Sequence, residues 1–313
     1  MVELDSIHYE QQYLDLMHRI WTTGDARVDR TGVGTRSLFG EQLRFDLRDG
    51  RVPLLTTKRI FWKTAAREML WFVSGDRNIR PLVAQNVHIW TDWPLDHYRR
   101  ESGEAIDRDT FEARILSDDA FAQKWGDLGP VYGHQWRHWP HYHSAGDGLY
   151  RRDPDGIDQL AALIDSLRNN PASRRHLFTG WNVADLPGMA LPPCHMTYQF
   201  HVASDGGLSC LLSQRSCDLA LGLPFNLFAA AMLTAMIAQQ TGLYPRELIW
   251  SGGDVHLYRN HAELVEVQLQ RTPDGDPRLS LSRVAPSLFD YCIEDFVVQG
   301  YAPQGHISAP VAV

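Results

Sequence analysis

The chain has 313 residues, of which 44% are apolar and 22% charged, and its formal net charge at pH 7 is -8. This composition is typical of a globular protein, and the length allows one large domain or two small ones. The negative charge excludes a broad basic surface for duplex nucleic acid, so an anion-binding site must be a local cluster of arginines.

Apolar residues at helical spacing predict a first helix over 13–21, which ends near Gly24. A glycine-bearing loop over 29–37 follows and leads into a strand over 38–47. The loop does not match a dinucleotide-binding fingerprint, because it lacks the third glycine and precedes a strand pattern. Its arginine, Arg30, is as consistent with a solvated residue as with a ligand.

The remainder of the chain interleaves helix and strand patterns without a strict βαβ repeat. A helix over 61–75 carries Glu68 one turn before its apolar end, where a carboxylate is either solvated or buried for a purpose. The apolar run over 227–238 is shorter than a bilayer span, so we interpret it as part of a buried helix and expect no membrane association. Further helices are predicted over 157–167 and 225–240, and strands over 177–181, 196–202, 208–212, 248–250, 278–284 and 296–298.

These patterns predict an α+β fold, in which residues 1–313 form a single domain with a mixed β-sheet flanked by helices. Two polar segments, near 96–124 and 140–155, have little periodicity and are interpreted as surface insertions. We expect them to be the least ordered parts of the chain. No internal repeat or linker divides the sequence.

A thiol, Cys194, follows two prolines and directly precedes a strand pattern, so its orientation should be fixed. A catalytic thiol needs a nearby cation, because a free thiol is only a few per cent ionised at neutral pH. Arginines occur upstream and downstream, but a buried cysteine beside a satisfied histidine would have the same pattern. A zinc site from Cys194, His195 and Cys217 fits no pair-of-pairs spacing. The four cysteines and an N-terminus without a leader pattern predict reduced thiols in the cytoplasm.

Seven motifs then occur in a characteristic order and spacing. They are DRTGVGT at 29–35, EMLWF at 68–72, GPVYGHQW at 129–136, MALPPCH at 189–195, QRSCD at 214–218, GLPFN at 222–226 and GDVHLY at 253–258. Together they closely resemble the folate-dependent thymidylate synthases over about 13–313. The resemblance implies the mixed-sheet fold of that family and a symmetric homodimer packed sheet to sheet. It also implies reductive methylation of dUMP to dTMP, with 5,10-methylenetetrahydrofolate as the donor of carbon and hydride and without a metal.

The resemblance implies a catalytic role for six residues. Cys194 would add to C6 of uracil, and Arg215 would favour its thiolate. Asn226 can bond O4 and N3–H of uracil together, whereas cytosine reverses these two functions. The proton-transfer network would be formed by Glu68, Tyr132 and His195, with Glu68 as the general acid-base residue.

The remaining implied contacts bind the two substrates. The nucleotide phosphate would be held by Arg30, Arg215, Ser216 and, from the partner subunit, Arg174 and Arg175. His256 and Tyr258 would bond the sugar, and Asp218 would contribute to both the nucleotide and the folate surfaces. The folate surface would include Trp90, Trp93, Leu221, Gly222 and Phe225, with Lys58 near the glutamate tail and a closing C-terminal segment, 309–313, that contains Ala312.

Two other functions use part of this pattern. A pyrimidine nucleotide 5-hydroxymethylase would use the same thiol and folate but let water complete the reaction, whereas Trp90 favours hydride transfer because it shields the methylene. A non-catalytic nucleotide- or RNA-binding protein would have lost some of these residues, and none of the main ones is missing. The sequence departs from the family pattern at Ser213, at Leu219 and Ala220, and over 227–229, which puts substrate detail in doubt but not the reaction class.

Overall fold

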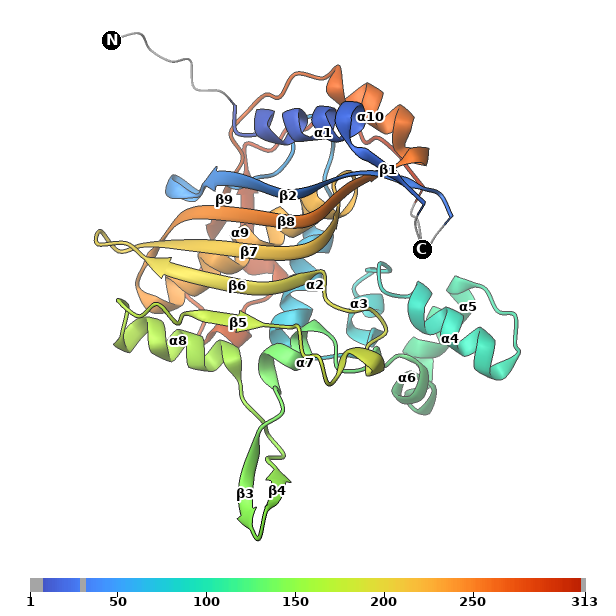
Figure 1. Cartoon of the computed structure of the whole chain (residues 1–313), viewed down its shortest axis with the longest axis vertical. Coiled ribbons are helices and arrows are strands. Elements are labelled where there is room, and N and C mark those ends of the chain that lie inside the picture. The colour runs from blue at the N-terminus through green and yellow to red at the C-terminus, as the bar shows by residue number, and fades with distance from the viewer. Residues whose placement is uncertain (1–7, 29–31, 311–313) are drawn as a thin grey trace.

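A computed structural model describes residues 8–28 and 32–310. Its central element is a six-stranded sheet of order β1-β2-β8-β7-β6-β5. Figure 1 shows the strands side by side, from one edge of the sheet to the other. Only β7 and β8 pair in parallel, so the sheet is mixed, as predicted. Its strands are β1 (Asp25–Arg27), β2 (Thr35–Asp46), β5 (Leu177–Thr179), β6 (His195–Val202), β7 (Gly207–Asp218) and β8 (Tyr244–Tyr258). Two separate ribbons are formed by β3 (Tyr142–Gly146) with β4 (Leu149–Arg152) and by β9 (Arg278–Leu281) with β10 (Phe296–Gln299).

The helices surround this sheet unevenly. The predicted helices over 13–21, 61–75 and 157–167 and the predicted strands over 38–47, 177–181 and 196–202 are present, but shorter helices between them were not predicted. The helices are α1 (Gln11–Thr23), α2 (Trp62–Ser74), α3 (Arg80–Ala84), α4 (Asp92–Ser102), α5 (Arg108–Ser117), α6 (Asp119–Trp125), α7 (Tyr132–Arg137), α8 (Gln159–Asn169), α9 (Gly222–Thr241) and α10 (Ala262–Leu269). Short 3-10 turns occur at Arg48–Gly50, Leu186–Gly188, Arg259–His261, Leu288–Asp290 and Ile293–Asp295.

The central helix of the core is α9, which joins the parallel strands β7 and β8 and packs against both of them. It is apolar on all sides because it is enclosed by the sheet, α2 and α8. The predicted apolar run 227–238 lies within this 20-residue helix, which by length and composition alone could cross a membrane. However, 72% of its most apolar window is buried inside the protein, which agrees with the predicted buried helix.

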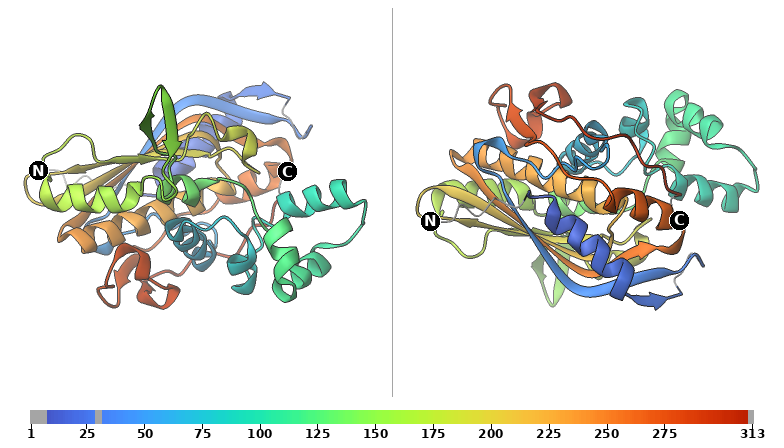
Figure 2. Two further views of the ribbon diagram at one scale, coloured as in Figure 1. Left: turned by 90° about the horizontal axis from the view of Figure 1, so that it is seen from below. Right: turned by 90° about the horizontal axis from the view of Figure 1, so that it is seen from above.

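The two sheet faces differ in cover. Along β7, Cys210 and Leu212 point into the core beside α9, while Leu211 and Ser213 alternate to the opposite face and are half-buried. Views from below and above show α8 and α9 on one side of the strands (Figure 2). On the opposite face, Ser213 pairs across the sheet with Thr197 and Ser251.

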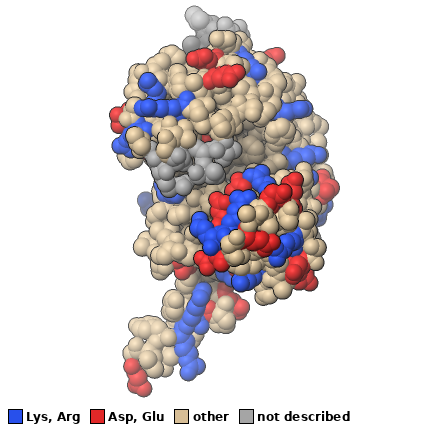
Figure 3. Space-filling view, turned by 90° about the vertical axis from the view of Figure 1, so that its right-hand side faces the viewer, with Lys and Arg blue, Asp and Glu red and all other residues tan. Residues whose placement is uncertain are grey.

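The polar segment near 96–124 is not irregular, contrary to expectation, but forms most of α4, α5 and α6. The aromatic rings of Tyr98, Phe111 and Phe121 pack together with centroids 5.2–5.8 Å apart, and this small core stabilises the three helices. The sequence shows little helical periodicity here because charged residues of both signs cover the outer surface of these helices (Figure 3). The second segment, near 140–155, forms the projecting hairpin β3–β4 (Figure 1).

A buried carboxylate joins the N-terminal helix to the loop that precedes α2. Glu10, fully buried at the start of α1, accepts hydrogen bonds from the backbone N–H groups of Thr56 and Thr57, at 2.7 and 3.0 Å. Both threonine hydroxyls also donate to it. The carboxylate therefore has donors for both oxygens, and the loop is fixed just before Lys58.

We expect Glu10→Gln to destabilise the protein by about 1–3 kcal/mol, because an amide cannot accept from every one of these donors and leaves buried polar groups unpaired. Urea unfolding followed by circular dichroism measures the change. Gln11→Ala is the matched control, since the Gln11 side chain donates to Asp15 at the surface. Equal midpoints for Glu10→Gln and Gln11→Ala would contradict this role of Glu10.

Candidate active site

Cys194 lies directly before β6, as predicted, and the next strand holds it through Arg215. The Arg215 N–H donates to the Cys194 carbonyl at 3.0 Å. Its guanidinium donates to the carbonyls of Pro193 and Pro192, at 2.9 and 2.8 Å, and one nitrogen lies 3.9 Å from the Cys194 sulfur. The same side chain thus fixes the loop before the thiol and places a positive charge beside it.

The thiol itself is not strongly acidic in this structure. Burial raises the pKa of Cys194, while Arg215 and the Tyr132 hydroxyl act in the opposite direction. The predicted effect of Arg215 therefore has the right sign, but desolvation outweighs it. Formation of the thiolate consequently requires a further step in which the proton leaves.

Tyr132, the first residue of α7, contacts this thiol directly. Its hydroxyl oxygen accepts the Cys194 N–H at 2.7 Å, and its ring stacks on Phe72 with centroids 4.7 Å apart. Burial raises the pKa of Tyr132 well above its usual range, so the phenol stays protonated and available as a donor. The GPVYGHQW motif is therefore part of the site as well as of the core.

Glu68 points from α2 towards the same region. The Trp90 indole N–H donates to a carboxyl oxygen of Glu68 at 2.8 Å. Burial raises the pKa of Glu68 to about 7, and the Trp90 hydrogen bond only partly opposes that shift. A carboxyl group that titrates near neutral pH can both donate and accept protons there.

His195 and Asn226 meet on the other side of the thiol. Burial lowers the pKa of His195 to about 4, and its hydrogen bond to the Asn226 side chain opposes this. The imidazole is therefore neutral. Its Nδ1 also lies 3.3 Å from the Tyr198 hydroxyl.

Gln214 orients Asn226, and the sequence analysis assigned it no role. Its amide accepts the Trp250 indole N–H at 2.9 Å and donates to the Asn226 Oδ1 at 2.9 Å. A buried polar residue at a position of β7 whose alternate neighbours are apolar would have been the clue. Because Gln214 donates to Oδ1, the orientation of the Asn226 amide is fixed.

Several residues expected to bind folate lie at the start of α9 and beside Trp90. Leu221, Gly222 and Phe225 lie half-buried at the start of α9, and Trp93 packs against Trp90 with centroids 5.3 Å apart. Asp218 accepts the backbone N–H groups of Ala220 and Leu221, at 2.8 and 3.1 Å, so it orders the turn into α9.

Lys58, which the resemblance places near the glutamate tail of the folate, is buried in this structure. It is only 4% exposed, and its ammonium donates to the Ala220 carbonyl. Burial lowers its pKa to about 8, although Asp218 and Glu10 favour the charged form. In this structure Lys58 supports the turn that carries the expected folate contacts.

Several residues expected around the sugar and phosphate lie on the neighbouring strands β7 and β8. Ser216 and Arg215 are adjacent on β7, and Asp218 at its end pairs with His256 of β8. The His256 Nδ1 lies 3.0 Å from an Asp254 oxygen, and its ring packs edge-on against Tyr258. Asp254 was not predicted, and it orients His256.

Two expected phosphate ligands lie beside β5 and not on β7 or β8. Arg174 and Arg175 are exposed just before β5 on the surface of the same chain. Arg30 and Ala312 lie outside the described residues. The sequence also missed Trp181, whose ring lies 5.4 Å from the Arg215 guanidinium carbon and packs against that charge.

The departures from the family pattern have clear positions. Ser213 lies on the half-buried sheet face, away from Cys210 and Leu212. Ala220 is buried and contributes its carbonyl to Lys58, while the carbonyl of buried Leu219 accepts the Tyr13 hydroxyl at 2.9 Å. The backbone carbonyls at 219–220 thus accept hydrogen bonds from two buried side chains.

All four cysteines are free thiols. Over 8–28 and 32–310, no three His, Cys, Asp or Glu side chains gather as metal ligands would. The cleft instead combines a held thiol, a carboxyl of pKa about 7, a neutral imidazole and a fixed amide. This set is typical of enzymes that combine a nucleophile with acid-base catalysis.

Comparison with known proteins identifies the family. The thymidylate synthase family profile matches residues 11–313. A thymidylate synthase of Sphingopyxis alaskensis is 72% identical over 309 residues, covering 99% of each chain. Those of Novosphingobium aromaticivorans and Rhizorhabdus wittichii are 66% and 65% identical over 306 residues, covering 98% of this chain and 97% and 99% of theirs.

The chain belongs to the thymidylate synthase family. The predicted fold class, the methyltransferase activity that converts dUMP to dTMP, and methylenetetrahydrofolate as co-substrate are thereby confirmed. The hydroxymethylase alternative is not favoured.

The raised pKa of Glu68 makes a prediction about stability. Folding disfavours the ionised carboxylate, so the native protein should lose stability relative to Glu68→Gln as the pH rises from about 4.5, the ordinary pKa, to about 7. Above pH 7 the difference should stay constant. Urea unfolding of both proteins between pH 4 and 8.5 measures it, and a difference that does not change with pH would refute the shift.

Proposed function

We propose that Cys194 is the nucleophile of this reaction and forms a covalent bond to C6 of uracil. The observation that carries the proposal is the pair of hydrogen bonds from Arg215 to the Pro192 and Pro193 carbonyls. They place a guanidinium nitrogen 3.9 Å from the Cys194 sulfur. Addition of sulfur at C6 moves the ring electrons towards C5 and O4, and C5 becomes the nucleophile that attacks the methylene carbon.

Asn226 reads the base in this proposal. Gln214 fixes the amide, which can then donate to O4, where negative charge develops, and accept from N3–H. Cytosine presents the opposite pattern and would leave buried groups unpaired.

Glu68 and its neighbours transfer protons. The carboxyl group, with a pKa of about 7, exists in both forms near neutral pH, so it can pass protons through water to and from the substrate. Tyr132 and neutral His195 supply hydrogen bonds in the same network. Loss of the C5 proton by this route breaks the bond between the methylene carbon and the folate amine and leaves an exocyclic methylene on the ring. Hydride from the folate then converts this methylene to methyl, the Cys194–C6 bond breaks to release the thiolate, and the products are dTMP and dihydrofolate.

The buried Trp90 supports methyl rather than hydroxymethyl as the product. It packs between Phe72 and Trp93 and donates to Glu68, so a large aromatic surface borders the acid-base group. Such a surface excludes water from a methylene group held beside it. The half-buried Leu221, Gly222 and Phe225, with Asp218, form the adjoining folate surface, Lys58 supports it, and the segment with Ala312 closes it.

The active unit is a homodimer that packs through the sheet face opposite α9. That face carries small hydroxyl residues in register, Thr197, Ser213 and Ser251, and is half-buried without a covering helix among the described residues. Arg174 and Arg175, which are exposed and distant from the thiol loop of their own chain, then complete the phosphate site of the partner together with its Arg30, Arg215 and Ser216. His256 and Tyr258 bond the sugar.

The chain functions as one catalytic domain over 1–313, with insertions near 96–124 and 140–155. A cytoplasmic location agrees with its four free thiols.

Cys194→Ser should lower turnover by more than about 1,000-fold and leave dUMP binding largely intact, because a serine hydroxyl is a much weaker nucleophile than a thiolate. Absorbance of dihydrofolate and the mass of the nucleotide, measured together, follow the reaction. Cys292→Ser, at an exposed thiol, is the control. Normal turnover in Cys194→Ser would refute the nucleophile, and a hydroxymethyl product from the native protein would refute the proposed end of the reaction.

The shared site predicts rescue between two inactive variants. An equal mixture of Cys194→Ser and Arg174→Ala/Arg175→Ala subunits should regain about a quarter of native activity, since half of the dimers are mixed and each has one intact site. The subunits are mixed after mild denaturation and refolding, and light scattering measures their mass. A dimer without rescue would show that the two arginines act within their own chain or not at all, and a monomer of full activity would refute the shared site.

A further inference from the structure

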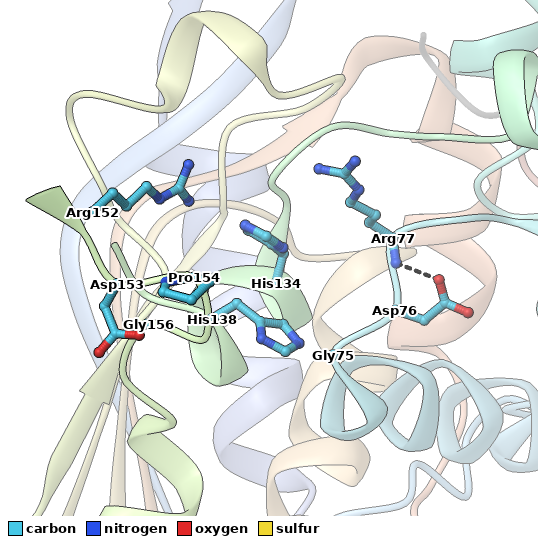
Figure 4. A pocket seen from close by; sticks show the side chains of 9 residues that line it. All are labelled: Gly75, Asp76, Arg77, His134, His138, Arg152, Asp153, Pro154 and Gly156. Carbon is cyan, nitrogen blue, oxygen red and sulfur yellow. Dashed lines mark hydrogen bonds between the residues drawn. The ribbon is translucent and has the colours of Figure 1, made fainter. Parts of the chain in front are cut away.

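A second cavity lies at the base of the β3–β4 hairpin, and none of the residues assigned to the active site lines it. Its volume is about 420 Å³. The turn after α2, the helix α7 and the end of β4 meet around it (Figure 4). Its lining residues are Gly75, Asp76, Arg77, His134, His138, Arg152, Asp153, Pro154 and Gly156.

Basic side chains converge on this cavity from three segments of the chain. Arg77 and Arg152 lie on either side of His134, with both guanidinium groups directed to the same side of the cavity (Figure 4). The rings of His134 and His138 have centroids 5.5 Å apart. Two guanidinium groups and two imidazoles therefore line one cavity.

The two acidic residues of the lining do not neutralise this cluster directly. Asp76 accepts the backbone N–H groups of Arg77 and Asn78, at 2.7 and 2.9 Å. Asp153 accepts the Asp155 N–H at 3.1 Å and lies 3.6 Å from the His141 ring. Figure 4 shows both carboxylates directed away from His134.

The cationic character of the cavity also acts on His134. Its pKa is lowered, first by burial and then by Arg77, His138 and Arg152, whereas Asp185 has the opposite effect. Arg77 has a carboxylate partner, Asp127, at 2.9 Å. Arg152 forms no ion pair within 8–28 and 32–310, so its charge is available to a ligand.

We propose that this cavity is a second anion-binding site, which takes the phosphate group of a phosphorylated small molecule. Guanidinium groups bind phosphate oxygens through paired, charge-assisted hydrogen bonds, and two of them on opposite sides can hold a tetrahedral dianion. The His134 and His138 rings add N–H donors. The volume of about 420 Å³ exceeds that of a phosphate group, so the organic part of the ligand also has room.

Nuclear magnetic resonance of the histidine ring protons tests the site with inorganic phosphate as the probe. The His134 signals are assigned by their loss in His134→Gln. Bound phosphate should move the titration midpoint of His134 to higher pH, since a nearby dianion favours the charged imidazole. The ring shift followed against phosphate concentration gives the affinity at this cavity alone, independently of anions in the active site.

Arg152→Gln should weaken this local affinity at least about tenfold, which corresponds to loss of one charge-assisted hydrogen bond. Arg151→Gln is the matched control, because Arg151 is adjacent on β4 and faces the opposite side of the ribbon. It should bind phosphate as the native protein does. Melting curves monitored by circular dichroism check that both variants are folded.

Two outcomes would overturn the proposal: a His134 signal that phosphate does not move, or equal weakening in Arg151→Gln and Arg152→Gln, which would indicate general attraction to the hairpin. A phosphate monoester, glycerol 3-phosphate, compared with inorganic phosphate then shows whether the organic part adds affinity. Tighter binding of the ester supports a phosphorylated metabolite as the ligand, and weaker binding overturns that part of the proposal in favour of free phosphate.

Discussion

The geometry of the active site depends on one cation, Arg215, which bonds to the carbonyls of both residues that precede the thiol. Carbonyl groups in a proline-rich loop have no helix or ladder partner, so they need donors from elsewhere. Arg215 supplies them from the neighbouring strand and is held in turn by the Trp181 ring. The position of Cys194 is therefore set by the pairing of β6 with β7, not by the loop alone.

Burial favours the neutral form of three ionisable groups at the site, the Cys194 thiol, the Glu68 carboxyl and the His195 ring. The pKa of Cys194 rises, that of Glu68 rises to about 7 and that of His195 falls to about 4. The Cys194 thiol and the His195 ring are consequently uncharged at neutral pH, and the cation beside them is Arg215. A dianionic nucleotide brings its own charge into this cleft, and the charge on the arginine is then balanced by ligand and thiolate together.

The sequence was informative where a single strong pattern decides the local structure. The strand after Cys194, the helix around Glu68 and the apolar run of α9 all follow from periodicity, and the motifs located most of the cleft. It failed at 96–124, where the three packed rings of Tyr98, Phe111 and Phe121 are spaced among charged residues. It also gave no role to Gln214 and did not indicate the contact between Lys58 and the Ala220 carbonyl, because these partners are brought together only by the tertiary fold.

The position of β8 between β2 and β7 has a consequence for how the chain reaches this structure. Thr35 pairs with Tyr258, so β2 has only the three-residue β1 as a described sheet partner until β8 has been synthesised. Pairing between such distant segments makes folding slow, and an unpaired strand is prone to aggregate in the meantime. During synthesis on the ribosome, the N-terminal third therefore cannot complete its sheet pairing until β8 emerges. A chaperone that binds this segment in the meantime would protect the nascent enzyme from aggregation.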